Sequence, residues 1–307
     1  MIEAKNLVRR YGNFLAVDDV SFAIEPGEVV GLLGHNGAGK TTIMKMLMGF
    51  LEPSAGQSLV DGVDVFAQPD LVQAQMGYLP ESSPLYPELT VFEYLSYAAQ
   101  LRGLDPARCV PQAIVATQLE SRAVDRIDTL SRGYKQRVGV AQAILHQPKF
   151  VILDEPSNGL DPTQTQHMRE LIRRLAENAT VILSTHIMQE VKAVCDRVLI
   201  LRAGQLALDE RLQDLQRASG VNLSTVAGAG VTQALHGLAA ATRITEGDTG
   251  NWTIELQGDL NSGASQVATA LVSAGVPIHS LAPAAADLES IFKQVNEARP
   301  DEVHDAA

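Results

Sequence analysis

The chain has no apolar run of the ~18–20 residues that a membrane-spanning helix requires. Residues 1–6 also lack the apolar core of a secretory signal peptide. We therefore expect a soluble, cytosolic protein, so that any role at a membrane depends on a partner.

Cysteine and positive charge are also scarce. Cys109 and Cys195 are the only cysteines among 307 residues and do not form a C-x-x-C pair, which argues against a disulfide framework or a cysteine-based metal site. The net charge is −12, with 19 basic and 23 acidic residues in 1–202 and 5 and 13 in 203–307. Neither part has the basic surface of a nucleic-acid binder, so we expect no nucleic-acid partner.

A phosphate-binding loop is the clearest feature that is present. Residues 34–42, Gly-His-Asn-Gly-Ala-Gly-Lys-Thr-Thr, fit G-x-x-x-x-G-K-[ST] between an apolar strand pattern and a helical pattern. Glycines let backbone N–H groups surround an anion at the start of a helix. Lys40 would reach the β- and γ-phosphates, and Thr41 would offer its hydroxyl to Mg²⁺. The predicted nucleotide-binding residues here are Gly34, Asn36, Gly37, Ala38, Gly39, Lys40, Thr41 and Thr42.

The patterns along the chain predict two domains. Alternating polar and apolar residues in 1–30 indicate antiparallel strands, and a helical pattern covers about residues 90–130. Short apolar runs alternating with helical segments then indicate a parallel sheet covered on both faces. The expected fold class is α/β, with a first domain at 1–215 and its helical subdomain at about 88–145.

Beyond residue 215 the composition shifts to Ala, Gly, Ser and Thr. We predict strands at 221–226, 241–246, 252–257 and 277–281, and helices at 231–239 and 263–274. This βαββαβ order is ferredoxin-like, so we expect a small α+β domain at 216–297. A last helix is expected at 288–296, followed by a flexible tail at 298–307.

Two carboxylates end the apolar strand pattern at residues 150–153. Asp154, placed beside the phosphate loop, would hold Mg²⁺ directly or through water. Glu155 points differently because it is one residue further on, and it could accept a proton from an attacking water.

Residues 130–137, Leu-Ser-Arg-Gly-Tyr-Lys-Gln-Arg, match L-S-G-G-Q followed by a basic residue, Gln and Arg, except at Arg132 and Tyr134. Together with the loop and the acidic strand end, this segment makes the chain resemble the nucleotide-binding subunits of ABC transporters. The resemblance implies a P-loop NTPase fold of the ABC type, with an antiparallel β subdomain, a parallel-sheet core and a helical subdomain. It also implies that Ser131 and the backbone of Gly133 contact the γ-phosphate of ATP held by a second subunit.

Further residues match the family in order. Tyr11 resembles the aromatic residue that stacks on adenine, residues 157–161 resemble the D-loop, and His186 resembles the histidine that binds the γ-phosphate and orients water. The resemblance thus implies Glu155, His186 and Lys40 as catalytic residues and Thr41 and Asp154 as Mg²⁺ ligands. Glu81 stands where the family usually has Gln near Mg²⁺. It can still coordinate the ion and is a third expected Mg²⁺ residue, but its added negative charge predicts an altered metal dependence.

The amino-acid sequence as a whole is most similar to those of ATPase subunits of gliding-motility-type exporters and of drug, lipid and polysaccharide exporters. This implies Mg²⁺-dependent ATP hydrolysis at a head-to-tail dimer of two such subunits, driving a separate integral membrane permease. The subunit would then be peripheral on the cytoplasmic face of the membrane. The alternative is a soluble ABC-type ATPase that acts as a nucleotide-gated switch without a membrane partner.

Overall fold

The computed structural model describes residues 1–215, 220–226, 230–236, 238–247, 250–284 and 288–297. The described chain divides into two compact units, residues 1–210 and 211–297. The predicted boundary at 215 falls just inside the second unit, because the short helix α8 (Leu212–Leu215) groups with that unit. The predicted tail at 298–307 lies outside the described residues.

A six-stranded sheet forms the centre of the first unit. Its order is β10-β9-β3-β8-β7-β6, and the pairs β9/β3, β3/β8, β8/β7 and β7/β6 are parallel. The strands are β3 (Val29–Leu33), β6 (Met76–Leu79), β7 (Phe150–Asp154), β8 (Thr180–Thr185), β9 (Arg197–Arg202) and β10 (Gln205–Arg211). The carboxyl ends of β3, β7 and β8 are adjacent, which places the residues that follow each strand at one edge.

The sheet is buried on both faces, because successive side chains of a strand point to opposite sides. Ile152 and Ile182 face helix α1 (Lys40–Leu47) and the β subdomain, whereas Leu153 and Leu183 face helix α6 (Pro162–Ala176). Helix α7 (Met188–Val194) adds Val191 and Val194 to the buried residues. The predicted α/β class with a covered parallel sheet is therefore confirmed.

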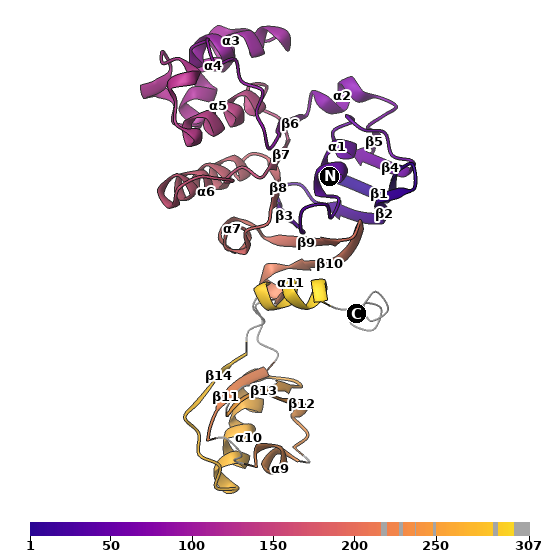
Figure 1. The fold of residues 1–307 in the computed structure, drawn as a ribbon, viewed down its shortest axis with the longest axis vertical. Coiled ribbons are helices and arrows are strands. Elements are labelled where there is room, and N and C mark those ends of the chain that lie inside the picture. Colours follow the sequence, from indigo (N-terminus) through magenta and orange to yellow (C-terminus); the bar gives the residue numbers. More distant parts are fainter. Residues whose placement is uncertain (216–219, 227–229, 237, 248–249, 285–287, 298–307) are drawn as a thin grey trace. The chain divides into compact units, whose positions relative to one another are not determined.

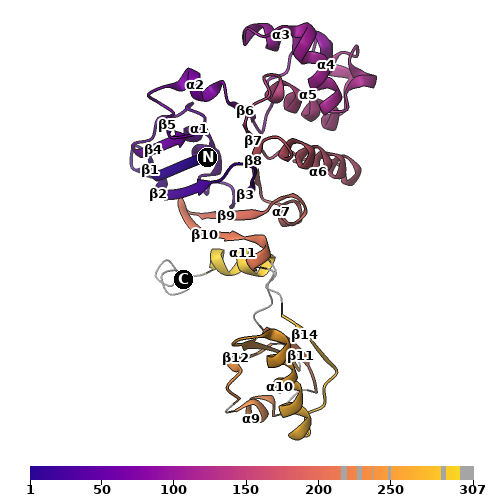
Figure 2. The same ribbon diagram turned by 180° about the vertical axis from the view of Figure 1, so that it is seen from behind.

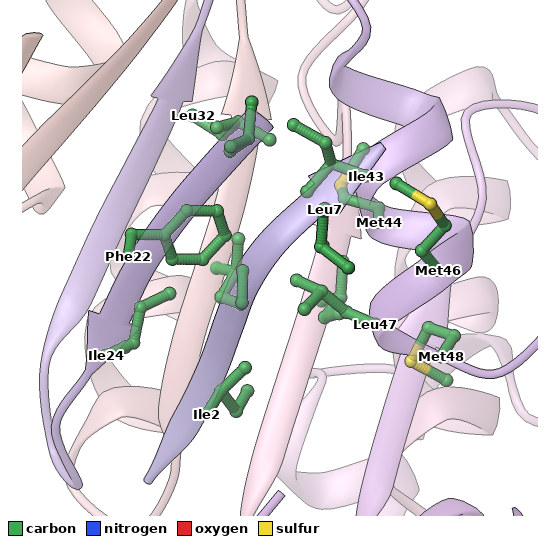
Figure 3. Close-up of a cluster of buried hydrophobic side chains, with 14 of the residues drawn as sticks. Ile2, Leu7, Phe22, Ile24, Leu32, Ile43, Met44, Met46, Leu47 and Met48 are labelled. Atoms are coloured by element: carbon green, nitrogen blue, oxygen red, sulfur yellow. The ribbon is translucent and has the colours of Figure 1, made fainter. Parts of the chain in front are cut away.

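An antiparallel sheet of order β2-β1-β4-β5 packs on the first of these faces. Its strands are β1 (Ile2–Tyr11), β2 (Phe14–Ile24), β4 (Ala55–Val60) and β5 (Val63–Asp64), and helix α2 (Pro69–Gln73) follows. Figure 3 shows Leu7 of β1 and Phe22 of β2 in one cluster with Ile43 and Leu47 of α1. Helix α1, which carries the end of the phosphate loop, is thus anchored between two sheets.

Three helices form the helical subdomain: α3 (Val91–Leu101), α4 (Pro106–Ala116) and α5 (Arg132–Ile144). They lie on the side of the central strands away from the antiparallel sheet in both views (Figures 1 and 2). Thr90 and Glu93 start α3 with reciprocal side-chain-to-backbone hydrogen bonds, a capping box. The subdomain has its own core around Leu95, Ile114 and Val138. This packing fixes the position of the N-terminus of α5.

The second unit contains a four-stranded antiparallel sheet of order β12-β13-β11-β14. Its elements are β11 (Gly220–Ser224), α9 (Val231–Leu235), β12 (Ala241–Glu246), β13 (Asn251–Leu256), α10 (Leu260–Ser273), β14 (Ser280–Pro283) and a last helix, α11 (Leu288–Glu297). The βαββαβ order is the predicted ferredoxin-like one. The last strand begins at Ser280 rather than at 277, because Pro277 has no N–H for a ladder and its carbonyl accepts a hydrogen bond from Thr225. Likewise, α9 ends at Leu235 rather than at 239.

In the part of the chain that the structure describes, no helix has the length and apolar character needed to cross a bilayer.

Candidate nucleotide-binding site

The phosphate loop joins β3 to α1 and depends on its glycines. Gly37 and Gly39 have φ of 85° and 106°, a region that residues with a Cβ rarely adopt. A Cβ at Gly39 would lie 2.8 Å from the carbonyl oxygen of Ala16, and one at Gly34 would lie 2.8 Å from that of Leu201. The loop therefore follows a path that other residues would obstruct, and it brings its backbone to the N-terminus of α1.

Lys40 is the first residue of α1 and is buried, with 7% of its surface exposed. Its Nζ donates hydrogen bonds to the carbonyl oxygens of Gly34 at 2.6 Å and His35 at 3.4 Å. Burial lowers the pKa of Lys40, and the nearby carboxylates of Glu155, Asp154 and Glu81 oppose that shift. The ammonium group thus lies between the loop and a cluster of acidic groups.

Asp154 ends β7 and is 2% exposed. Its Oδ2 accepts from Thr41 Oγ1 at 3.3 Å, and its Oδ1 accepts from Ser184 Oγ at 2.5 Å. Burial raises the pKa of Asp154, while the two hydroxyl donors favour the charged form. The acidic strand end and the phosphate loop are therefore in direct contact.

Glu155 and His186 form a pair at the same edge. His186 Nδ1 lies 2.9 Å from Glu155 Oε2, although the two residues are 31 positions apart in sequence. Burial raises the pKa of Glu155, and the interactions with His186 and Lys40 oppose this. The backbone of Glu155 has a φ of 49°, which is uncommon for a residue other than glycine.

The loop and the carboxylates line a pocket of about 350 Å³, whereas His186 is not in its lining. It is lined by Tyr11, Phe14, Ala16, His35, Asn36, Gly37, Gly39, Lys40, Thr41, Thr42, Glu81, Asp154 and Glu155. Gly34 and Ala38 are absent from this lining and shape the loop from behind, where Ala38 N donates to His35 O at 3.0 Å. A pocket with a backbone loop, one ammonium group and three carboxylates is suited to a polyanion accompanied by a divalent cation.

Tyr11 and Glu81, which both line the pocket, contact residues outside its lining. Tyr11 is 46% exposed, and the guanidinium carbon of Arg9 lies 4.7 Å from its ring centre. Glu81 Oε1 accepts a hydrogen bond from Asn158 Nδ2 at 3.4 Å. Glu81 is therefore tied to the loop that follows Glu155.

Ser131 and Gly133 lie elsewhere, at the N-terminus of α5. Ser131 caps the helix by accepting from Tyr134 N at 3.5 Å. The side chain of Gln164 occupies the space beside Gly133, and the guanidinium of Arg132 lies on Gly159. Neither Ser131 nor Gly133 is in the pocket lining, so within one chain the structure does not bring them to the phosphate loop.

The structure also adds residues that the sequence patterns did not single out. Phe14 lines the pocket and is 62% exposed, just after the turn that follows Tyr11. Ser184 contacts both members of the acidic strand end. In the sequence, Ser184 is marked only by its position two residues before His186 in a polar strand end. Its contacts with Asp154 and Glu155 depend on which strands are neighbours, and a local pattern does not show this.

Comparison with known proteins agrees with this geometry. The family model described as ABC transporter matches residues 17–158. The ABC transporter ATP-binding protein YxlF of Bacillus subtilis is 37% identical over 229 residues, which cover 74% of this chain and 76% of YxlF. The bacitracin transport ATP-binding protein BcrA of Bacillus licheniformis is 35% identical, over 67% of this chain and 68% of BcrA.

A solved ATP-binding subunit of an ABC transporter is similar as well. It is 35% identical with a TM-score of 0.63, and the match covers 71% of this chain and 92% of that one. The likeness therefore extends from the sequence to the fold of the first unit. The chain belongs to the ABC transporter family, as an ATP-binding subunit with ATPase activity.

Proposed function

We propose that this chain hydrolyses Mg·ATP at a head-to-tail dimer of two copies and thereby drives a separate membrane permease that exports its substrate. One observation supports the dimer above all. The pocket is lined by the loop and the three carboxylates, and His186 lies beside it on Glu155, but Ser131 and Gly133 are neither in the lining nor bonded to it in this way. A second copy would supply them. ATP-binding subunits of this family function as dimers with membrane permease partners.

In this proposal the backbone of the phosphate loop, with Gly34, Asn36, Gly37, Ala38, Gly39 and Thr42, holds the phosphates. Lys40 exchanges its contacts with the loop carbonyls for the β- and γ-phosphates and neutralises charge in the transition state. Tyr11 stacks on the adenine with its exposed face. Phe14 is a second aromatic side chain at the same end of the pocket.

The side chains also fit a magnesium ion. Thr41, Asp154 and Glu81 present hydroxyl and carboxylate oxygens, which this hard cation prefers. Among the described residues no three His, Cys, Asp or Glu side chains converge closely enough to hold a metal alone. This agrees with an ion that needs the phosphate oxygens as further ligands. When bound, Mg²⁺ would supply charge neutralisation at the phosphates.

Glu155 is the proposed base for the attacking water, and His186 orients that water. The raised pKa of Glu155 makes its carboxylate a better proton acceptor. The hydrogen bond between the two side chains keeps the carboxylate directed toward the histidine. Catalysis then comes mostly from positioning and charge neutralisation.

Two observations support a permease partner. BcrA is by name a bacitracin transport subunit, which favours a transporter over a soluble switch. Exposed aromatic side chains at Tyr86, Phe92 and Tyr97 lie between the pocket residue Glu81 and the end of α3. They give a membrane subunit a surface connected to the pocket. The subunit would be peripheral on the cytoplasmic face.

The experiment that tests this proposal is co-purification. The protein is tagged at its C-terminus, membranes are solubilised in mild detergent, and bound proteins are identified by mass spectrometry. We expect a multi-spanning membrane protein in near-equal amount. Recovery only from the soluble fraction, with ribosomal or DNA-repair proteins, would support the soluble switch instead.

A further inference from the structure

Ser184 is fully buried in β8 and is not among the residues that line the pocket. The parallel pairing of β7 and β8 sets it opposite Asp154. His186 follows two residues later. Ser184 therefore lies where the strands that carry the acidic pair and the histidine meet.

The hydroxyl of Ser184 uses both its proton and a lone pair. It donates to Asp154 Oδ1 at 2.5 Å and accepts from the backbone N–H of Glu155 at 3.2 Å. The bond to Asp154 is short, as expected when a hydroxyl donates to a carboxylate. One side chain thus contacts two consecutive acidic residues, one through its carboxylate and the other through its backbone.

The contact with Glu155 coincides with unusual backbone geometry. Glu155 has a φ of 49°, and its N–H also donates to the carbonyl oxygen of Ser184 at 3.1 Å. Left-handed backbone at such residues persists only where the surroundings hold it. This turn directs the Glu155 carboxylate toward His186, whereas Asp154 faces Thr41.

We propose that Ser184 is a positioning residue that sets both carboxylates for ATP hydrolysis: it fixes the metal-facing rotamer of Asp154 and the turn that aims Glu155. The inference rests on the proposed function, because it takes Asp154 as a metal ligand and Glu155 as the base. Ser184 does not line the pocket in which the nucleotide would bind. Its loss therefore affects the Mg²⁺-dependent steps and leaves nucleotide binding to the loop in place.

The test is Ser184→Ala, with Ser58→Ala as the matched control. Ser58 is equally buried, but its hydroxyl has no hydrogen-bond partner among the described residues, and it lies in β4 of the antiparallel sheet. Four quantities are measured on the full chain. They are the Kd of a fluorescent ATP analogue in EDTA, the gain in that affinity on adding Mg²⁺, kcat, and the Mg²⁺ concentration that gives the half-maximal rate.

For Ser184→Ala we expect the Kd in EDTA to match those of the wild type and Ser58→Ala. Either kcat or the gain in affinity produced by Mg²⁺ should fall by about 10- to 100-fold. A loss of this size is typical when the hydrogen-bond partner of a metal-ligating carboxylate is removed. Wild-type kcat and Mg²⁺ requirement would overturn the inference. So would a loss of affinity in EDTA as large as the loss of kcat, since that pattern belongs to a damaged fold.

Asp154→Asn and Glu155→Gln are assayed alongside. If both lose activity while Ser184→Ala keeps it, only the role of Ser184 is refuted. If both keep wild-type kcat, the proposed function itself fails, and the inference fails with it.

Discussion

His186 Nδ1 lies 2.9 Å from Glu155 Oε2, and this contact joins the ends of two neighbouring strands across the pocket edge. Glu155 is nearly buried, whereas the side chain of His186 is 51% exposed. The histidine can therefore reach a ligand outside the chain while it remains bonded to the carboxylate. One group of the pair is therefore shielded and the other is open to solvent, which is consistent with the acid–base role proposed for them.

Replacing Glu155 with Gln should stop turnover and leave ATP bound. The amide keeps the size of the side chain but cannot take a proton, so we expect kcat to fall by about 100- to 10,000-fold. The ATP-bound protein should then persist as a dimer on size-exclusion chromatography, with ADP as the control nucleotide. Rapid hydrolysis by this variant would remove Glu155 as the base.

Replacing Lys40 with Ala should weaken ATP binding strongly. The buried ammonium group is close to the loop that would hold the phosphates, and a hydrogen bond to a charged group is worth about 1.5–3 kcal/mol, or about 10- to 100-fold in Kd. Lys45→Ala is the matched control, because Lys45 is exposed on the same helix. The measurement is titration calorimetry with ATP. Equal affinity of the two variants would overturn the phosphate-loop assignment.

Much of this site could be predicted from the sequence, because its parts are local. Gly37 and Gly39 mark the loop, and Asp154 and Glu155 end an apolar run, so each motif identifies itself within a few residues. Ser184 could not be identified this way. Its contacts depend on β7 and β8 being neighbours in register. A local sequence pattern does not indicate which strands are neighbours. Phe14 was missed because one exposed aromatic residue after a turn carries no periodic signal.

The C-terminal unit shows the same distinction. The order of its strands and helices was predicted from the sequence. The start of β14 was not, because the hydrogen bond from Thr225 to the carbonyl of Pro277 joins residues 52 positions apart.

Replacing Glu81 with Gln should raise the Mg²⁺ concentration needed for half-maximal ATPase activity. The change removes a negative charge beside Lys40 and Asp154. Glu81 is exposed, and an exposed ion pair contributes about 0–1 kcal/mol, so we expect a rise of about two- to fivefold. Glu120→Gln, an exposed change away from the pocket, is the control. An unchanged or lower Mg²⁺ requirement would show that Glu81 does not help to hold the metal.

The stability of the protein should fall between pH 6.5 and about pH 4 because of His146. This residue follows α5, and its Nε2 is 3.1 Å from the carbonyl oxygen of Met76. Its Nδ1 is buried with no hydrogen-bond partner among the described residues. Burial, followed by the charge of Arg102, lowers its pKa from 6.5 to about 4.

The sign follows from which state takes up the proton. As the pH falls below 6.5 the unfolded chain protonates His146, while the folded chain keeps it neutral until about pH 4. Lowering the pH through this range therefore stabilises the unfolded state and reduces the free energy of unfolding. His146→Gln should therefore lose less stability than the wild type between pH 7.5 and pH 5.0. After discounting for partial exposure we expect a difference of about 1 kcal/mol. Urea unfolding at both pH values measures it, with His167→Gln on the exposed side of α6 as the control. If the wild type and His146→Gln lose stability equally, His146 is not the group responsible.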